Sequence, residues 1–143
     1  MSKTIVFIPG TWDLFHIGHL KVLQKAKALG DVLVVGVQSD RGSYKIKGSE
    51  PTVSCKDRMA LLEGLACVDI AVEYDEDYPT LVTQFDVDVV CLGDDYRLDS
   101  RLEEVSKYMR KRGGRIIRLP RTSLISTTDI KKSIRKELNG TRQ

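Results

Sequence analysis

Residues 4–29, TIVFIPGTWDLFHIGHLKVLQKAKAL, hold the pattern that decides the fold. The first five of these residues form a short, continuous apolar run, which is typical of a buried strand. Apolar residues then recur at helical spacing over 20–29. Between these two segments lie Gly10 and the only two histidines of the chain, His16 and His19. The pattern predicts a strand, a glycine-containing turn and a helix that starts near the histidines.

Strands and helices continue to alternate beyond this stretch. Residues 32–37 form a second apolar strand, too uniform for a sheet with one wet face. Residues 39–53 hold glycines and a proline among charges, and we expect a long mobile loop there. Further strands are expected at 68–72, 87–92 and 115–119, and further helices over about 55–66, near 79–85, around 102–109 and from 126 onward, the last with Ile130, Ile134 and Leu138 as its inner face.

This alternation predicts one α/β domain over residues 1–143, with a parallel sheet covered by helices on both faces. In such a sheet, ligands bind beyond the carboxyl ends of the strands. The segments expected at those ends are 9–19, 39–47, 93–97 and 121–128, and they hold the unusual residues of the chain.

The composition is that of an ordinary globular protein, because 41% of the residues are hydrophobic and 30% are charged. No apolar run approaches the ~20 residues that a membrane span needs, and no leader-like segment precedes the first strand. We therefore expect a cytoplasmic protein without membrane contact. The three cysteines, Cys55, Cys67 and Cys91, show no C-x-x-C spacing and are expected to be reduced thiols.

Charge is distributed unevenly along the chain. Residues 1–100 carry 10 Lys and Arg against 16 Asp and Glu, whereas residues 101–143 carry 13 against 4. The basic end could bind nucleic acid, as in a nucleotide-binding regulator, or its cations could face a phosphorylated small molecule. Tyr108 is the only aromatic residue there that could stack on a base, so we expect no nucleic-acid partner.

The histidine pair admits three interpretations. Two rings three residues apart on a helix could bind a metal ion. However, such a site needs further ligands, and the chain offers no third histidine and only Asp13 nearby in the sequence. The rings could pack in the core, although a strand exit beside glycines is a poor place for that. They could instead handle phosphate: Gly10 permits a tight turn, Gly18 lets a phosphate approach, and the helix start favours an anion. Two imidazoles would then stabilise charge that grows on a pentacoordinate phosphorus.

Two motifs carry a resemblance to a known family. Residues 11–19, TWDLFHIGH, resemble the GTFD…HxGH signature of the nucleotidylyltransferase superfamily. Residues 121–128, RTSLISTT, resemble the RTxxISTT signature of its cytidylyltransferase branch. Residues 93–96, GDDY, are similar to the GDDW-type segment of glycerol-3-phosphate cytidylyltransferases, the group to which the resemblance is nearest. The resemblance spans nearly the whole chain.

The resemblance implies a Rossmann-like fold, commonly homodimeric, that condenses CTP with a phosphorylated alcohol, here glycerol 3-phosphate. The products would be a CDP-alcohol and pyrophosphate, with Mg²⁺ carried by the triphosphate and no metal ligand from the protein. It implies catalytic roles for His16, His19, Lys45, Lys47 and Arg121, nucleotide binding by Pro9, Gly10, Thr11, Trp12, Asp13, Gly18, Arg58, Gly93, Asp94, Ser126, Thr127 and Thr128, and substrate binding by Asp95 and Tyr96.

Some residues keep other interpretations open. Lys45 and Lys47 alternate along the expected loop, so both could face one ligand, or both could be solvated. Arg58 lies on a helix where an exposed arginine would be unremarkable. Leu65-Ala66 stands where the glycerol-3-phosphate group has an arginine, while residues 47–53 and 76–79 look more like heptose-1-phosphate adenylyltransferases. The alternative is therefore an adenylyltransferase that acts on a sugar 1-phosphate.

Overall fold

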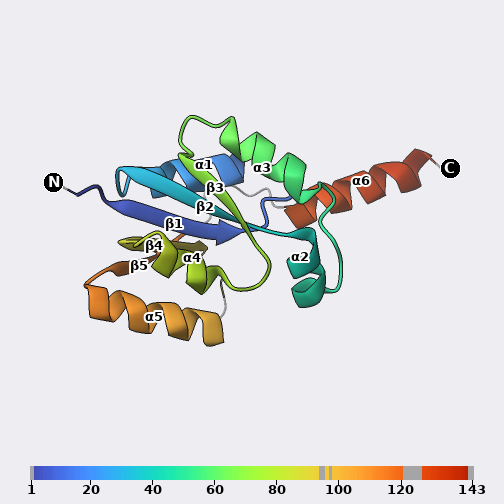
Figure 1. The fold of residues 1–143 in the computed structure, drawn as a ribbon. Coiled ribbons are helices and arrows are strands. Elements are labelled where there is room, and N and C mark those ends of the chain that lie inside the picture. Colours follow the sequence, from blue (N-terminus) through green and yellow to red (C-terminus); the bar gives the residue numbers. More distant parts are fainter. Residues whose placement is uncertain (1, 94–95, 97, 121–126, 142–143) are drawn as a thin grey trace.

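The computed structural model describes residues 2–93, 96, 98–120 and 127–141. Within these ranges, strands and helices alternate along the chain (Figure 1). The strands are β1 (Ile5–Gly10), β2 (Val32–Gln38), β3 (Ile70–Tyr74), β4 (Val89–Gly93) and β5 (Arg115–Leu119), and the helices are α1 (Ile17–Lys27), α2 (Asp40–Lys47), α3 (Cys55–Glu63), α4 (Tyr78–Gln84), α5 (Ser100–Arg112) and α6 (Thr127–Thr141).

The five strands form one parallel sheet in the order β3-β2-β1-β4-β5. β1 is central, and its Val6 lies opposite Leu33 of β2 on one side and Val89 of β4 on the other. The chain runs outward from β1 to β3 and then crosses back to β4, so the strand order reverses beside β1. In open α/β sheets, ligands bind at such a switch point. The loop that follows β1 leads to both histidines, which lie at the start of α1.

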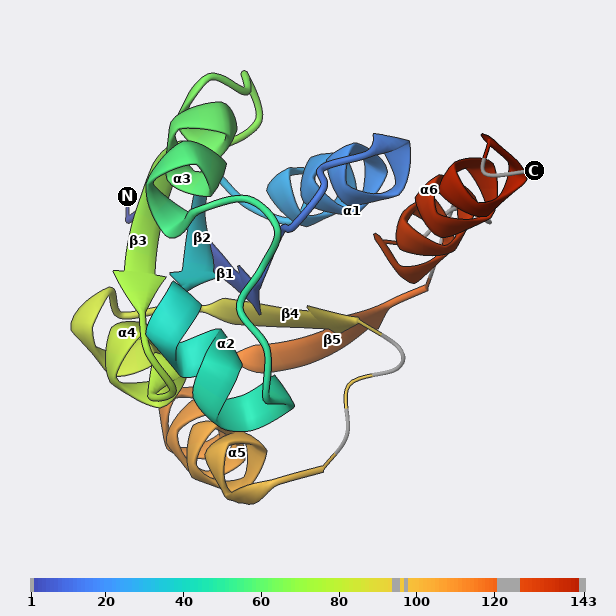
Figure 2. The same ribbon diagram turned by 90° about the vertical axis from the view of Figure 1, so that its right-hand side faces the viewer.

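Alternate residues of the strands face two separate cores. Val6 and Ile8 of β1 belong to the core that α1 and α3 cover. Phe7, between them, belongs to the core that α4 and α5 cover. Figure 2 looks onto the carboxyl ends of the strands, with α1 and α3 above the sheet and α4 and α5 below it. The predicted parallel sheet with helices on both faces is confirmed.

The loop predicted for residues 39–53 is partly wrong, because residues 40–47 form α2. Ser39 caps this helix by accepting the Gly42 N–H at 2.9 Å, and Gly48 ends it with φ +79°. A Cβ on Gly42 would lie 1.9 Å from the carbonyl oxygen of Asp75. Glycine is therefore required at position 42 because two backbones approach closely there. In the sequence, the same glycine suggested that no helix would form.

The inner face predicted for the last helix is also partly wrong. Ile134 and Leu138 of α6 are 48% and 56% exposed. Ile130, the first residue of the predicted face, is half-buried, so the prediction fails only for the other two residues. In Figure 1, α6 extends away from the sheet toward the C-terminus. The three thiols are free, as expected. No helix within the described ranges is long and apolar enough to cross a membrane.

Candidate active site

The two histidines form the start of α1. His16 is the N-cap, and its Nδ1 accepts the Gly18 backbone N–H at 3.0 Å. His19 is the third helical residue, and its Nδ1 accepts the His16 backbone N–H at 3.2 Å. Such reciprocal bonds usually involve Ser or Thr at the cap and Glu or Gln three residues later. Here two imidazoles take both places, so the backbone fixes the position of each ring.

These bonds also determine which ring nitrogen carries a proton. A neutral imidazole has one N–H donor and one acceptor nitrogen. Because both Nδ1 atoms accept backbone N–H groups, the ring proton lies on Nε2 of His16 and of His19. The rings stack with centroids 4.0 Å apart. The pair therefore offers two Nε2–H donors at a helix start, where the dipole favours an anion.

His19 is held among aromatic rings and stays neutral. Phe15 stacks on it with centroids 5.2 Å apart, and Trp12 meets it edge-on at 5.6 Å. Burial and then the neighbouring His16 lower the pKa of His19 to about 4, against the opposing effect of Asp13. At pH 7, His19 can therefore donate a hydrogen bond to a phosphate oxygen without a change in its own protonation.

The loop between β1 and α1 is strained. Trp12 and Leu14 have φ values of +62° and +47°, in the left-handed region, which costs a non-glycine residue roughly 1–3 kcal/mol. The Trp12 side chain is buried, and its Nε1–H donates to the Gly36 carbonyl at 3.0 Å. A Cβ on Gly10 would lie 2.8 Å from the Trp12 ring. Gly10 and Trp12 were predicted to bind the nucleotide. In the structure, the buried Trp12 ring packs against Gly10 and supports the loop.

Asp13 joins this loop to the segment after α2. Its carboxylate is buried and accepts the backbone N–H groups of Leu14, Thr52 and Val53 at 3.1, 2.8 and 2.9 Å. Burial alone would raise the pKa of Asp13. The three hydrogen bonds and the charge of Lys131 together have the larger effect, so the pKa lies below its ordinary value. Asp13 is therefore ionised at neutral pH and acts as a positioning residue for the loop.

Lys45 and Lys47 do not face one ligand. In the helix α2, residues two apart lie on nearly opposite sides, because each residue turns the helix by about 100°. Lys47 Nζ donates to Thr11 Oγ1 at 2.9 Å, beside the histidine loop. Lys45 Nζ pairs instead with Glu76 at 3.3 Å. The expectation of an extended segment on which both lysines face the same side is wrong, because both lie in the helix α2.

Arg58 is not an exposed residue either, being 1% exposed. Its Nε donates to Val53 at 2.9 Å, one terminal nitrogen donates to Thr11 and Gln38 at 2.6 and 2.7 Å, and the other pairs with Asp40 at 2.7 Å. Four of its five N–H groups are thus used within the protein. Arg58 connects the loop after β1 with both ends of the segment that holds α2, and these contacts fix the position of that segment.

A cluster of rings lies where β4 ends. The Tyr96 hydroxyl donates to the Tyr78 hydroxyl at 2.9 Å. The Arg101 guanidinium lies 5.1 Å from the Tyr78 ring centroid and 6.0 Å from that of Tyr96. Asp99 holds Arg101 through two bonds, at 3.2 and 3.0 Å. The hydroxyl of Tyr96, predicted to contact substrate, is therefore engaged within the protein.

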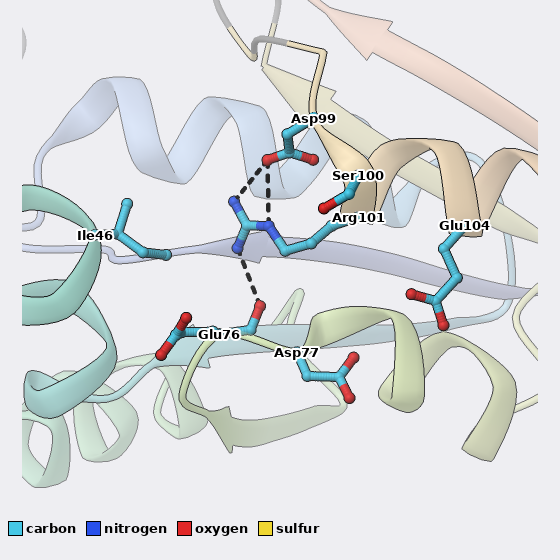
Figure 3. Close-up of a pocket in the computed structure, with 7 residues that line it drawn as sticks. All are labelled: Ile46, Glu76, Asp77, Asp99, Ser100, Arg101 and Glu104. Carbon is cyan, nitrogen blue, oxygen red and sulfur yellow. Dashed lines mark hydrogen bonds and ion pairs between the residues drawn. The ribbon is translucent and has the colours of Figure 1, made fainter.

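A groove of about 440 Å³ lies beside this cluster (Figure 3). Figure 3 shows Arg101 crossing it to the Glu76 carbonyl, a bond of 3.1 Å. Carboxylates dominate the remaining wall, and Ile46 comes from α2, the helix that also carries Lys47. The groove is lined by Ile46, Glu76, Asp77, Asp99, Ser100, Arg101 and Glu104.

The remaining predicted residues are placed in part. Asp94, Asp95, Arg121 and Ser126 lie outside the described residues. Thr127 begins α6, and Thr128 is exposed on its first turn. The same helix brings a residue that the sequence analysis missed, Lys131, whose Nζ lies 3.6 Å from Asp13 Oδ2. Its spacing of three from Thr128 was the available signal, since such residues share a helix face.

The other predicted positions lie at strand and helix ends. Pro9 lies near the end of β1, opposite Gly36, and Gly93 ends β4. The N–H of Gly18 is taken by His16, so it is not open to a phosphate. Within the described ranges, no group of three or more metal-ligating side chains occurs.

Comparison with known proteins identifies related sequences. The family model described as cytidylyltransferase-like matches residues 7–133. The chain is 39% identical over 133 residues to the bifunctional protein HldE of Syntrophotalea carbinolica, which covers 90% of this chain and 26% of that protein. It is 38% identical to HldE of Geobacter sulfurreducens over 94% of this chain and 28% of that protein. The chain thus spans about a quarter of the length of these relatives.

Solved structures give the same result for the fold. The lipopolysaccharide core biosynthesis protein of Thermoplasma volcanium superposes with a TM-score of 0.74 at 30% identity, over 85% of this chain and 100% of that one. Pantoate-beta-alanine ligase of Francisella tularensis superposes with a TM-score of 0.59 at 17% identity, over 90% of this chain and 68% of that one, and so shares the fold alone. With the family model matching most of its length, the chain belongs to the cytidylyltransferase-like family.

Proposed function

We propose that this chain transfers a nucleotidyl group from a nucleoside triphosphate to the phosphate of a sugar. The observation that carries the proposal is the stacked pair of His16 and His19 at the start of α1, whose Nδ1 atoms accept backbone N–H groups, so that their ring protons lie on Nε2. Donors fixed before the reaction stabilise growing charge without reorganisation, and phosphoryl chemistry depends mainly on such electrostatics.

The reaction would proceed in one displacement. An oxygen of the acceptor phosphate attacks the α-phosphorus, a new O–P bond forms, and the bond from that phosphorus to the bridging oxygen breaks to release pyrophosphate. No general base is needed, because a phosphate monoester is already anionic at neutral pH. The barrier lies in bringing two polyanions together, and the imidazole donors and Lys47 offset that repulsion.

Magnesium would reach the site on the triphosphate. The described residues fit this arrangement, since Asp13, the carboxylate nearest the loop, already accepts three backbone N–H groups. When bound, the ion would supply charge neutralisation for the leaving pyrophosphate.

The relatives favour ATP and a sugar 1-phosphate over CTP and glycerol 3-phosphate. The HldE proteins support the adenylyltransferase alternative, with heptose 1-phosphate as the acceptor. The sequence signals for CTP are the motifs at 121–128 and 93–96, and residues 94, 95 and 121–126 of these motifs lie outside the described residues. We therefore propose adenylyl transfer to a sugar 1-phosphate.

The groove beside α5 suits the hydroxyl groups of such an acceptor. Carboxylates accept hydrogen bonds from several hydroxyls at once, and Glu76, Asp77 and Glu104 line the groove. It lies along α2, which also directs Lys47 to Thr11. The hydroxyls of the sugar would then bind in the groove, whose one cationic lining residue is Arg101.

Substrate profiling tests the proposal. The protein is incubated with each of four nucleoside triphosphates and a panel of phosphorylated alcohols and sugar 1-phosphates, and products are identified by mass. We expect an ADP-sugar and pyrophosphate from ATP. A CDP-alcohol from CTP would support the chemistry and reject the substrates, whereas no pyrophosphate from any combination would reject the function.

The groove is tested by Glu104→Gln, with Glu103→Gln as the matched control on the same helix. Loss of a charged hydrogen-bond acceptor typically costs about 1.5–3 kcal/mol, so we expect the sugar-phosphate KM of Glu104→Gln to rise roughly tenfold or more while the ATP KM stays unchanged. Equal KM values in the two variants would remove the groove from the acceptor site.

A further inference from the structure

Tyr78 is a buried polar residue that the reaction described above does not use. It begins α4 and is 0% exposed, so its hydroxyl lies inside the core that α4 and α5 cover. Its ring stacks on Phe7 of β1 with centroids 6.2 Å apart and meets Tyr74 of β3 edge-on at 6.0 Å. A buried hydroxyl is costly unless it is hydrogen-bonded, so its partner shows what the hydroxyl is for.

That partner is Tyr96, which follows β4. The two hydroxyl oxygens lie 2.9 Å apart. The backbone of Tyr96 is held as well, because its N–H donates to the Gly93 carbonyl at 3.1 Å and its carbonyl accepts from Arg118 of β5 at 2.8 Å. Tyr96 is thus fixed both at its backbone and at the tip of its side chain, at the carboxyl end of β4.

Tyr96 in turn contacts residues that begin α5 and line the groove. Its hydroxyl lies 3.4 Å from Asp99 Oδ2, and the same oxygen accepts from Arg101 at 3.2 and 3.0 Å. The Arg101 guanidinium also lies over the rings of both tyrosines. A chain of contacts therefore runs from the buried Tyr78 hydroxyl to a guanidinium that crosses the groove (Figure 3).

The protonation states of this cluster are fixed near neutral pH. Burial and then the bond with Tyr96 raise the pKa of Tyr78, and burial raises that of Tyr96, so both remain phenols. Burial opposes the ionisation of Asp99, but its bonds with the Leu102 N–H and with Arg101 outweigh burial and lower its pKa. Tyr78 is therefore neither an acid nor a base at neutral pH, and its hydroxyl can act only by holding its neighbours in place.

We propose that Tyr78 is a positioning residue for the acceptor site: its hydroxyl fixes Tyr96 and, through Tyr96 and Asp99, sets the orientation of Arg101 in the groove. This inference rests on the proposed function, which places the sugar hydroxyls there. Arg101 uses three of its five N–H groups on Asp99 and the Glu76 carbonyl, and the other two can donate to an oxygen of the sugar. A donor held in one orientation binds that oxygen without a cost in side-chain ordering.

Tyr78→Phe tests the proposal, because it removes one hydroxyl and keeps the buried ring. Tyr74→Phe is the matched control, since it removes the hydroxyl of the ring packed against Tyr78 in the same core. We expect the KM for the sugar 1-phosphate to rise about fivefold in Tyr78→Phe alone, while kcat and the KM for ATP stay within about twofold in both variants. Adding Tyr78→Phe to Tyr96→Phe should raise the acceptor KM no further, because the two hydroxyls share one hydrogen bond.

A second measurement does not depend on activity. The Nε–H of Arg101, which donates to Asp99, is followed by NMR and assigned by its loss in Arg101→Lys. We expect it to exchange with solvent severalfold faster in Tyr78→Phe than in the wild type or in Tyr74→Phe.

The outcomes separate the inference from the function. An unchanged acceptor KM in Tyr78→Phe, an equal rise in Tyr74→Phe, or unchanged exchange at Arg101 would each overturn the positioning role. Lower thermal stability in Tyr78→Phe without a change in acceptor KM would mean that the hydroxyl only stabilises the core, and would overturn it too. If exchange at Arg101 quickens as expected but the wild type releases no pyrophosphate from any nucleotide, the proposed function fails while the coupling of Tyr78 to Arg101 stands.

Discussion

His19 shows how a single residue is adapted at this site. Its Nδ1 completes the helix cap, its ring packs on Phe15 and Trp12, and its Nε2 carries the proton. This packing lowers the pKa of His19 to about 4, first through burial and then through the neighbouring His16. The protonated form is thus disfavoured in the folded state, which makes stability depend on pH.

The expected dependence has a definite sign. Unfolded His19 titrates near 6.5 and folded His19 near 4, so the unfolded chain binds more protons between these values. Stability therefore falls as the pH drops from 6.5 to 4, by at most about 1.4 kcal/mol per pH unit from this group. Urea unfolding of the wild type and of His19→Gln measures it. Gln keeps the capping bond, and we expect the variant to lose less stability over this range. Parallel curves would contradict the assignment.

Sequence reasoning at this scale singled out residues whose chemistry is rare in the chain and overlooked residues of a common type. The two histidines stood out because the chain has no others. Arg58 resembled an ordinary surface arginine, and nothing in its neighbours indicated that it would donate to carbonyls 47 and 20 residues away. Lys131 was one lysine among many in a basic segment. Such roles depend on tertiary contacts that the local sequence does not record.

At the scale of elements, α2 decides which side chains meet. Because the segment is helical, Lys47 contacts Thr11 while Lys45 pairs with Glu76. In an extended loop, the two lysines would lie on the same side. The strands were predicted well because buried parallel strands are continuous apolar runs. The helix was missed because Gly42, which reads as a helix breaker, is required by the neighbouring carbonyl of Asp75.

The placement of α2 predicts that Gly42→Ala is damaging. The added Cβ would lie 1.9 Å from the Asp75 carbonyl oxygen, so the two backbones must separate. We expect a loss of roughly 1–3 kcal/mol in the free energy of unfolding, with a raised KM because Lys47 moves. Gly140→Ala is the control, since a Cβ there meets nothing within 4 Å. Chemical denaturation measures the free energy of unfolding of both variants. Equal values for Gly42→Ala and Gly140→Ala would contradict the described position of α2.

At the scale of the whole molecule, the fold brings distant segments to one edge of the sheet. The loop after β1, helix α2 and helix α6 all lie toward the carboxyl ends of the strands (Figure 2). The alternation of strands and helices was enough to predict that these segments meet at one edge, which is the candidate ligand site. It did not predict the buried connections of Asp13 and Arg58, which hold the edge together. Homodimer formation remains a prediction that the mass of the protein in solution would test.

The central claim is that the Nε2–H groups of the histidine pair act on the reacting phosphate. It is tested most directly by the rate of pyrophosphate release from His16→Asn, with the nucleotide and acceptor found by profiling. Asn is a good N-cap, so the helix start and the thermal midpoint should be kept while the Nε2 donor is lost. We predict that kcat falls by about 10²-fold or more. A kcat within a few-fold of the wild type, at unchanged stability, would contradict the claim.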